Sequence, residues 1–380
     1  MIICNKCFAS EQIQETIEMY GTIGKWSKGK CPTCQSVGAY LLDTENASEY
    51  VPELAEWLSD LISCFQTEEN LPQSFPRKHL GMLKTELKKN WNLFADGVDD
   101  EDVYEIITSV CADLYAFSPE LFDKPVGLSF RSDANILQEH SLIYEKAWDD
   151  FVYEITNVNR YHARTINLDV FKRILSHLRI TIPKDTEYYR CRLTDNEIPF
   201  DPAQMGPPPV GKASSGRANA AGISCLYLAN DVRTTIAEVR AGVFDNATVG
   251  TFRLKHDIQV VDLRKINKLC PVGIGMNYAD YALNRKHLEK IDSEMARGLK
   301  RGDHSIDYVA TQYITDFVKS VRVLDEKGEP QNAYYGIVYN STLNPGGYNL
   351  AIFYADVFEC VKTQLYCVKS LAYGTEPQMA

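Results

Sequence analysis

The sequence predicts a multidomain protein with a small cysteine-rich domain, an all-α middle domain and a C-terminal α+β domain built on a central mixed sheet. Three observations lead to this prediction: two closely spaced cysteine pairs near the N-terminus, helical periodicity in the middle of the chain, and β-rich segments that alternate with helical ones after residue 183. The 380 residues suffice for two or three domains of roughly 150 residues each. The predicted domains are 1–42, 43–182 and 183–380.

The composition is that of an ordinary globular protein, with 45% hydrophobic and 24% charged residues. The formal net charge of −11 repels phosphate groups, which disfavours a general nucleic-acid binder. Charged residues interrupt every long apolar run, so we expect no membrane-spanning helix. The first residues lack the basic and apolar regions of a signal peptide, and we therefore predict a cytoplasmic protein.

The N-terminal domain contains two CxxC pairs, Cys4 with Cys7 and Cys31 with Cys34. A CxxC turn directs both thiolates to one point, and two such turns complete a tetrahedral Cys₄ shell. The spacing therefore predicts Zn²⁺ bound by all four cysteines. Because four thiolates leave no open coordination position, we expect this metal to stabilise the domain and to take no part in chemistry.

The middle domain shows helical periodicity, most clearly behind the acidic residues 99–101. The stripe there consists of apolar residues at three- and four-residue steps: Val103, Ile106, Ile107, Val110, Leu114 and Phe117. This spacing predicts one amphipathic helix. Similar stripes elsewhere, together with few Gly and Pro, favour an all-helical bundle over residues 50–180.

The C-terminal domain alternates between the two periodicities. We predict helices at residues 232–243, 278–295 and 308–321, and strands at residues 225–228, 249–254, 258–263, 335–340, 350–356 and 358–368. Such a mixture is typical of an α+β or α/β domain with a substantial sheet.

The loop at residues 211–219 reads GKASSGRAN, and its glycines permit close approach of a ligand to the backbone. Arg217 offers a planar set of five donors that suits a phosphate or pyrophosphate, although an arginine in such a loop is more often a solvated surface residue. On the following predicted helix, Glu238 falls outside the apolar stripe, so its side chain faces either solvent or a cleft. Ser341 lies at a strand-to-turn edge, where polar side chains tend to face ligands.

Taken together, the order and spacing of these pieces over residues 186–370 resemble the RES domain, a toxin family named for its Arg, Glu and Ser. The matching residues are Tyr189, Arg190, Met205, Pro207, Pro208, Gly216, Arg217, Ala218, Asn219, Gly222, Tyr227, Leu228, Ala229, Ala237, Glu238, Val239, Tyr339, Asn340, Ser341, Gly347, Asn349 and Leu350. Family members commonly carry Trp or His near position 219, where this chain has Ala218 and Asn219.

The resemblance implies an ADP-ribosyltransferase-like fold and the destruction of NAD⁺ by cleavage of the nicotinamide–ribose bond. In this reading Glu238 stabilises the oxocarbenium-like transition state. Arg217 grips the pyrophosphate or adjoining ribose, Tyr227 stacks on the nicotinamide or ribose, and Ser341 orients the nicotinamide ribose.

Two further residues belong to the implied binding site: Arg190, or its neighbour Arg192, as a second cation, and Asn219 in the glycine-serine loop. The resemblance allows two acceptors for the ADP-ribosyl group. With water the protein is an NAD⁺ glycohydrolase, and with phosphate it is an NAD⁺ phosphorylase. Two alternatives are transfer of ADP-ribose to a macromolecule and a non-enzymatic RNA- or protein-binding adaptor.

The N-terminal regions resemble the zinc-knuckle and HEPN-like extension found ahead of some RES domains. A nuclease HEPN domain carries an Arg-x4–6-His motif, which residues 50–180 lack, so we do not expect RNA cleavage. An enzyme that depletes NAD⁺ harms its own cell. The resemblance therefore implies restraint by an Xre-type antitoxin or by the N-terminal region itself, released by a signal such as phage infection. A homo-oligomer is compatible with the sequence.

Overall fold

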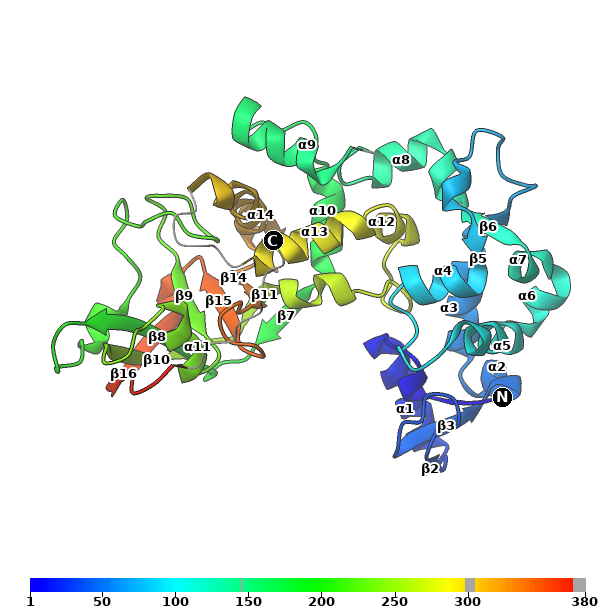
Figure 1. Ribbon diagram of the computed structural model, residues 1–380, viewed down its shortest axis with the longest axis horizontal. Coiled ribbons are helices and arrows are strands. Elements are labelled where there is room, and N and C mark those ends of the chain that lie inside the picture. Colours follow the sequence, from blue (N-terminus) through cyan, green and yellow to red (C-terminus); the bar gives the residue numbers. More distant parts are fainter. Residues whose placement is uncertain (145, 298–304, 372–380) are drawn as a thin grey trace, which may run out of the picture. The chain divides into compact units, whose positions relative to one another are not determined.

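The computed structural model describes residues 1–144, 146–297 and 305–371, and these form two compact units (Figure 1). The first unit contains Met1–Trp148, Arg164–His177 and Asn267–Leu288. The second contains Asp149–Ala163, Leu178–Ile266 and the described part of Glu289–Ala380. Segment 267–288 thus belongs to the first unit, whereas the predicted C-terminal domain included all of 183–380. No described helix has the length and apolar character that crossing a membrane requires.

The first unit begins with a three-stranded antiparallel sheet in the order β1-β3-β2. Its strands and the helices of this unit are β1 (Ile2–Cys4), α1 (Glu11–Ile23), β2 (Lys28–Gly29), β3 (Ala39–Asp43), α2 (Ala47–Tyr50), α3 (Pro52–Ile62), α4 (Leu83–Asn90), α5 (Asp100–Val110), α6 (Ala112–Phe117), α7 (Glu120–Asp123), α8 (Ala134–His140), α10 (Leu168–Ser176) and α12 (Tyr278–Ala282). Helix α5 starts where the acidic run predicts, because the Asp99 carboxylate accepts hydrogen bonds from two backbone N–H groups of the first turn.

The prediction of an all-α middle domain is wrong, because this region also contains a three-stranded antiparallel sheet, β4-β6-β5. The strands are β4 (Phe65–Thr67), β5 (Gly81–Met82) and β6 (Pro125–Leu128). Strands of two to four residues hold too little alternation to be recognised from a pattern. The predicted single helix through residue 117 is also two helices, α5 and α6, and Phe117 is 86% exposed.

An eight-stranded sheet forms the centre of the second unit, in the order β16-β10-β8-β9-β15-β14-β11-β7. The β11–β14 pair is parallel and the other pairs are antiparallel, so the sheet is mixed as predicted. The strands are β7 (Arg179–Ile182), β8 (Glu187–Thr194), β9 (Leu226–Ala229), β10 (Asn246–Leu254), β11 (Ile258–Asp262), β14 (Gly336–Asn340), β15 (Tyr348–Ile352) and β16 (Phe358–Cys367). A separate hairpin joins β12 (Arg322–Leu324) to β13 (Pro330–Asn332).

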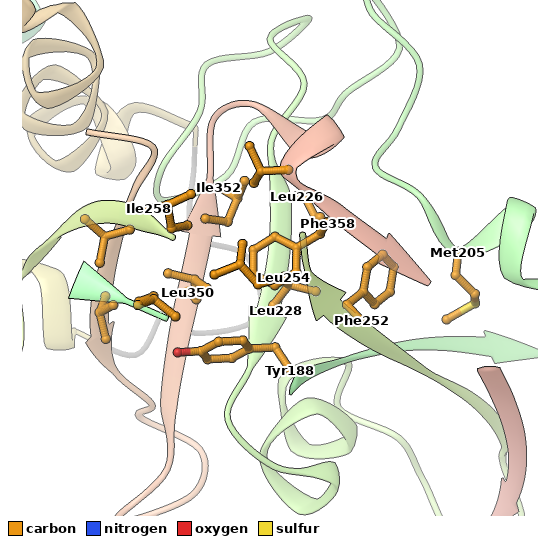
Figure 2. Packing of buried hydrophobic residues seen from close by; sticks show 14 residues of the cluster. Tyr188, Met205, Leu226, Leu228, Phe252, Leu254, Ile258, Leu350, Ile352 and Phe358 are labelled. Carbon is orange, nitrogen blue, oxygen red and sulfur yellow. The ribbon is translucent and has the colours of Figure 1, made fainter. Parts of the chain in front are cut away.

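The main hydrophobic core of this unit covers one face of the sheet. Figure 2 shows side chains that come from strands far apart in the sequence, among them Tyr188 of β8, Leu228 of β9, Leu254 of β10 and Leu350 of β15. Because these residues pair across the sheet at alternating positions, their neighbours in sequence point to the opposite face.

That opposite face is covered by helix α11 (Val232–Glu238). Val232 and Ile236 of the helix pack against Cys191 of β8 and Val249 of β10. The predicted helix 232–243 is too long, because the chain leaves the helix after Glu238 and Arg240 adopts a φ of 52°. The remaining helices are α9 (Trp148–Tyr153), α13 (Arg285–Ala296) and α14 (Val309–Ser320), and the predicted helix 278–295 is interrupted between α12 and α13.

Candidate functional site

Glu238 is the last residue of helix α11, and its carboxylate accepts two hydrogen bonds from neutral donors. Ser341 Oγ donates to Oε1 over 2.6 Å and Asn349 Nδ2 donates to the same oxygen over 2.8 Å. Glu238 forms no ion pair within the part of the chain that the structure describes. The carbonyls at a helix C-terminus carry partial negative charge, so the helix end does not neutralise the carboxylate of Glu238 either.

Strand register brings the two donors to Glu238. Tyr339 of β14 pairs with Asn349 of β15, which pairs with Ala229 of β9, so these side chains share the face that α11 covers. Ser341 follows β14 and is only 9% exposed. Its Oγ also accepts hydrogen bonds from the backbone N–H groups of residues 343 and 344, at 3.3 and 3.2 Å, which hold the side chain in one orientation.

Arg217 lies in the glycine-serine loop, and carbonyl groups hold its guanidinium. Nη1 donates to the carbonyl of Met295 and Nη2 to that of Arg297 over 2.6 Å, both at the C-terminal end of α13. A cation at this end of a helix is favourable because the unpaired carbonyls carry partial negative charge. The guanidinium carbon also lies 5.5 Å from the centre of the Tyr339 ring.

Tyr227 and Asn219 hold the same loop together. The Tyr227 hydroxyl donates to Asn219 Oδ1 over 2.6 Å and accepts from the backbone N–H of Ala218 over 2.9 Å. Asn219 Nδ2 contacts three carbonyl oxygens, those of residues 214, 220 and 223. Gly216 is required here, since a Cβ atom would lie 2.6 Å from Tyr227 Oη and 2.7 Å from Asn219 Oδ1. The polar atoms of both side chains therefore support the loop.

The buried Tyr339 ring connects the two charged residues of the site. Burial raises the pKa of the Tyr339 hydroxyl, the positive charge of Arg217 opposes that rise, and the negative charge of Glu238 adds to it. The charges of Arg217 and Glu238 thus act on one buried group, although no hydrogen bond joins their side chains among the described residues.

Arg190 of β8 is a largely buried cation beside Tyr227. Its Nη1 donates to the Tyr227 carbonyl over 3.4 Å, and its Nε is buried without an acceptor among residues 1–144, 146–297 and 305–371. Burial, and secondarily the charge of Arg192, lower the pKa of Arg190. Arg192 itself donates to the Gln204 carbonyl and stacks 4.4 Å from the Phe200 ring centre.

The structure therefore brings the predicted residues into two groups. Glu238 contacts Ser341 directly, and Tyr227 contacts Asn219 side chain to side chain. Arg190 reaches the second group through the backbone carbonyl of Tyr227. Arg217 belongs to the loop of the second group and reaches the first through the Tyr339 ring.

Two residues of this arrangement, Tyr339 and Asn349, were not predicted as site residues. Asn349 is a polar residue inside the apolar strand Tyr348–Ile352, which was the available signal. Its proximity to Glu238 follows from the strand pairing, which the sequence alone does not give.

Four cysteine sulfurs of the first unit lie within 4.8 Å of one another. The Sγ–Sγ distances are 3.9 Å for Cys4 and Cys7, 3.5 Å for Cys4 and Cys34, and 3.6 Å for Cys7 and Cys31. The backbone N–H of Cys4 donates to Cys7 Sγ over 3.4 Å, as a CxxC turn requires. The hydrogen bond with the Cys7 side chain lowers the pKa of the Cys4 thiol to about 5. This cluster can bind a metal ion.

Comparison with known families and proteins gives one match. The family model described as the RES domain matches residues 187–373. The match supports the resemblance stated from the motifs, and it includes segment 267–288, which the structure assigns to the first unit. No curated protein and no solved structure matches the chain.

Proposed function

Because residues 187–373 carry a RES domain, we propose that the protein is a RES-type toxin or effector that degrades NAD⁺ by cleaving its nicotinamide–ribose bond. We take the domain to be ADP-ribosyltransferase-like. The observation that supports the reaction best is the Glu238 carboxylate, which two neutral donors orient and no described cation neutralises. Such a group has its negative charge available for a positively charged reaction centre.

In the proposed step the bond between the ribose C1′ and the nicotinamide nitrogen breaks, and both bonding electrons leave with nicotinamide. The nicotinamide ring becomes neutral and the ribose acquires oxocarbenium character. Glu238 stabilises this charge, which is small in the ground state and large in the transition state. Water then gives ADP-ribose and a proton, or phosphate gives ADP-ribose 1″-phosphate. Ser341 and Asn349 hold the carboxylate in place.

We assign binding of the pyrophosphate to Arg217, with Arg190 as the second cation. Arg190 is suited to an anion because it is partly buried, has a buried Nε without an acceptor and has no described carboxylate partner. We assign contact with the nicotinamide or ribose to the ring of Tyr227, since its hydroxyl is already bonded within the loop. Asn219 shapes the binding loop.

We propose that the four cysteines hold Zn²⁺. Tetrahedral zinc with Zn–S bonds of about 2.3 Å separates its sulfurs by about 3.8 Å, and the observed distances of 3.5–3.9 Å fit this geometry. The metal would stabilise the fold around β1 and α1. With four thiolate ligands it has no position for a substrate.

Restraint of the activity is a further part of the proposal, either by an Xre-type antitoxin or by the N-terminal region. Deleting that region is a poor test, because Tyr278 and Tyr281 of α12 pack against Trp91 with ring centres 5.9 and 5.5 Å apart. Removal of residues 1–180 would expose these rings. Experiments should therefore use the whole chain.

The proposal is tested by incubating the purified chain with NAD⁺, with and without phosphate, and measuring free nicotinamide. We expect release by the wild type, a loss on the order of 10² to 10³ in rate for Glu238→Gln, and no loss for the control Glu359→Gln, which alters an exposed glutamate of β16. Equal release by Glu238→Gln would remove Glu238 from the mechanism.

The same experiment with NAD⁺ labelled in the adenosine moiety separates the candidate acceptors. Label in soluble ADP-ribose or its phosphate ester indicates depletion, whereas label on macromolecules indicates transfer. Absence of nicotinamide release under every condition would favour the adaptor alternative.

A further inference from the structure

Helix α14 contacts the Arg217 loop through two buried polar side chains, of which Gln312 makes the larger number of contacts. Gln312 is 8% exposed, and its Nε2 lies 2.8 Å from Ser215 Oγ, 2.8 Å from the Gly216 carbonyl and 2.9 Å from the Asn219 carbonyl. An amide nitrogen has two hydrogens, so it satisfies two of these acceptors at a time or shares them among three.

Thr311 precedes Gln312 on the same helix and contacts Arg217 itself. It is 2% exposed, and its Oγ1 lies 2.9 Å from the backbone carbonyl oxygen of Arg217. The same hydroxyl lies 3.0 Å from the carbonyl of Tyr308 in the helix. The carbonyls of residues 216, 217 and 219 are thus all held by two adjacent side chains of α14.

These contacts matter because the loop has little regular structure of its own. Its single described ladder contact is the isolated bridge between Gly216 and Asn219. Helix α14 is a firm support, since its residues Ile314 and Val318 are fully buried and the helix packs against β14. Because α14 is fixed by its packing in the core, its polar side chains hold the backbone of Arg217 in a defined position.

We propose that Thr311 and Gln312 are positioning residues for Arg217: by holding the backbone on both sides of it, they place its guanidinium where the pyrophosphate of the substrate binds. This inference rests on the proposed function, because it takes the substrate to be a dinucleotide. The hydrogen bonds of both side chains go to the loop and to α14 itself, so we assign them no part in the chemical step. Their effect passes through the loop, and a displacement of about 1 Å in a substrate-binding group can cost 10²-fold in rate.

The test compares isosteric variants of α14. Thr311→Val removes the hydroxyl that contacts Arg217, and Gln312→Leu removes the amide. The matched control is Thr315→Val, since Thr315 is equally buried but its hydroxyl donates within the helix, to the Thr311 carbonyl over 2.8 Å. We expect kcat/KM for nicotinamide release to fall on the order of 10- to 100-fold for Gln312→Leu, several-fold for Thr311→Val, and less than twofold for Thr315→Val.

A double-mutant cycle separates positioning from a general loss of structure. In an Arg217→Lys background we expect the loss caused by Gln312→Leu or Thr311→Val to shrink, because the side chain that they position is altered. An equal loss in both backgrounds, or unchanged kcat/KM in both variants, would overturn the inference while leaving the proposed function intact. Absence of turnover by the wild type would overturn both.

Trypsin gives a second measurement that does not depend on turnover. Lys327 is exposed in the turn between β12 and β13 and provides an internal reference outside the loop, whereas Arg217 is anchored in the loop. In folded Thr311→Val and Gln312→Leu we expect cleavage after Arg217 to accelerate relative to cleavage after Lys327, and no change in Thr315→Val. If Gln312→Leu does not fold, Thr311→Val decides, and an unchanged cleavage ratio in it would refute the anchoring.

Discussion

The two units each contain a carboxylate that several side chains hydrogen-bond, and the two carboxylates differ in what surrounds them. Asp280 of the first unit has a side chain that is 3% exposed. It accepts from Arg173 Nε over 2.7 Å and Nη2 over 2.8 Å, and its Oδ1 lies 2.8 Å from His140 Nδ1. Glu238 of the second unit is exposed and is bonded by a hydroxyl and an amide.

This difference is the physical basis on which we propose a structural role for Asp280 and a catalytic role for Glu238. The charge of Asp280 is neutralised by a bidentate guanidinium, and the ion pair joins α12 to α10 within the first unit. The carboxylate of Glu238 is oriented by its two hydrogen bonds, and its charge is not neutralised by them. A neutral donor fixes the geometry of the carboxylate and leaves its charge in place, and a bound substrate that excludes water would strengthen the interaction of this charge with a cationic transition state.

The largest effect on stability is expected at the cysteine cluster. It extends the comparison of the two carboxylates, because a bound metal ion would neutralise the negative charge of the four thiolates. Structural zinc contributes about 10–16 kcal/mol in isolated zinc-finger peptides. We expect a strong chelator, or Cys31→Ser, to unfold the segment around β1 and α1, measured by hydrogen exchange and by metal content. Since a metal held by four thiolates would have no open position for chemistry, we expect nicotinamide release to persist for as long as the second unit stays folded. Loss of release with unchanged hydrogen exchange would contradict this assignment.

Asp280→Asn and Glu238→Gln should have opposite consequences. Removing the charge of Asp280 leaves Arg173 without its partner and should lower the free energy of unfolding by about 3 kcal/mol, reduced to the extent that water screens the part-exposed arginine. Glu238→Gln should change stability little and activity greatly. Urea denaturation of both variants beside the nicotinamide assay measures the contrast. Comparable stability loss in both would break the comparison.

The smallest expected effect is a pH dependence of stability, which we expect from two histidines of the first unit. Burial lowers the pKa of His177 and of His287, both in the first unit, with nearby Asp280 opposing the shift at His177. The unfolded state, with a histidine pKa of about 6.5, therefore binds protons more readily. Stability from these residues is present above about pH 6.5 and is lost as pH falls toward their folded pKa values. In His287→Gln the urea unfolding midpoint should change less between pH 7.5 and pH 5.5 than it does in the wild type. An unchanged pH dependence would show that His287 does not contribute to it.

Local features of the fold were readable from the sequence because they depend on short spacings. The CxxC pairs predicted a cluster that the structure places within 4.8 Å, and Asp99 marked the start of a helix. The failures have equally local reasons. The two- to four-residue strands β4, β5 and β6 carry no usable period, and the positive φ of Arg240 ended a helix whose apolar pattern continued.

The site was less predictable from first principles. The residue types of Arg217, Glu238 and Ser341 singled them out only weakly, and the order of motifs along the chain supplied their proposed roles. The sequence by itself determined the metal-ligand pattern, the mixed sheet and the identity of the candidate residues, because each of these depends on neighbours or on the order of motifs.

Tertiary structure alone decided that Ser341 reaches Glu238 across 103 positions, that Asn349 joins them, that α14 holds the Arg217 loop and that residues 267–288 belong to the first unit. The physical reason is that strand register and core packing are set by burial summed over many distant residues, which no local pattern records.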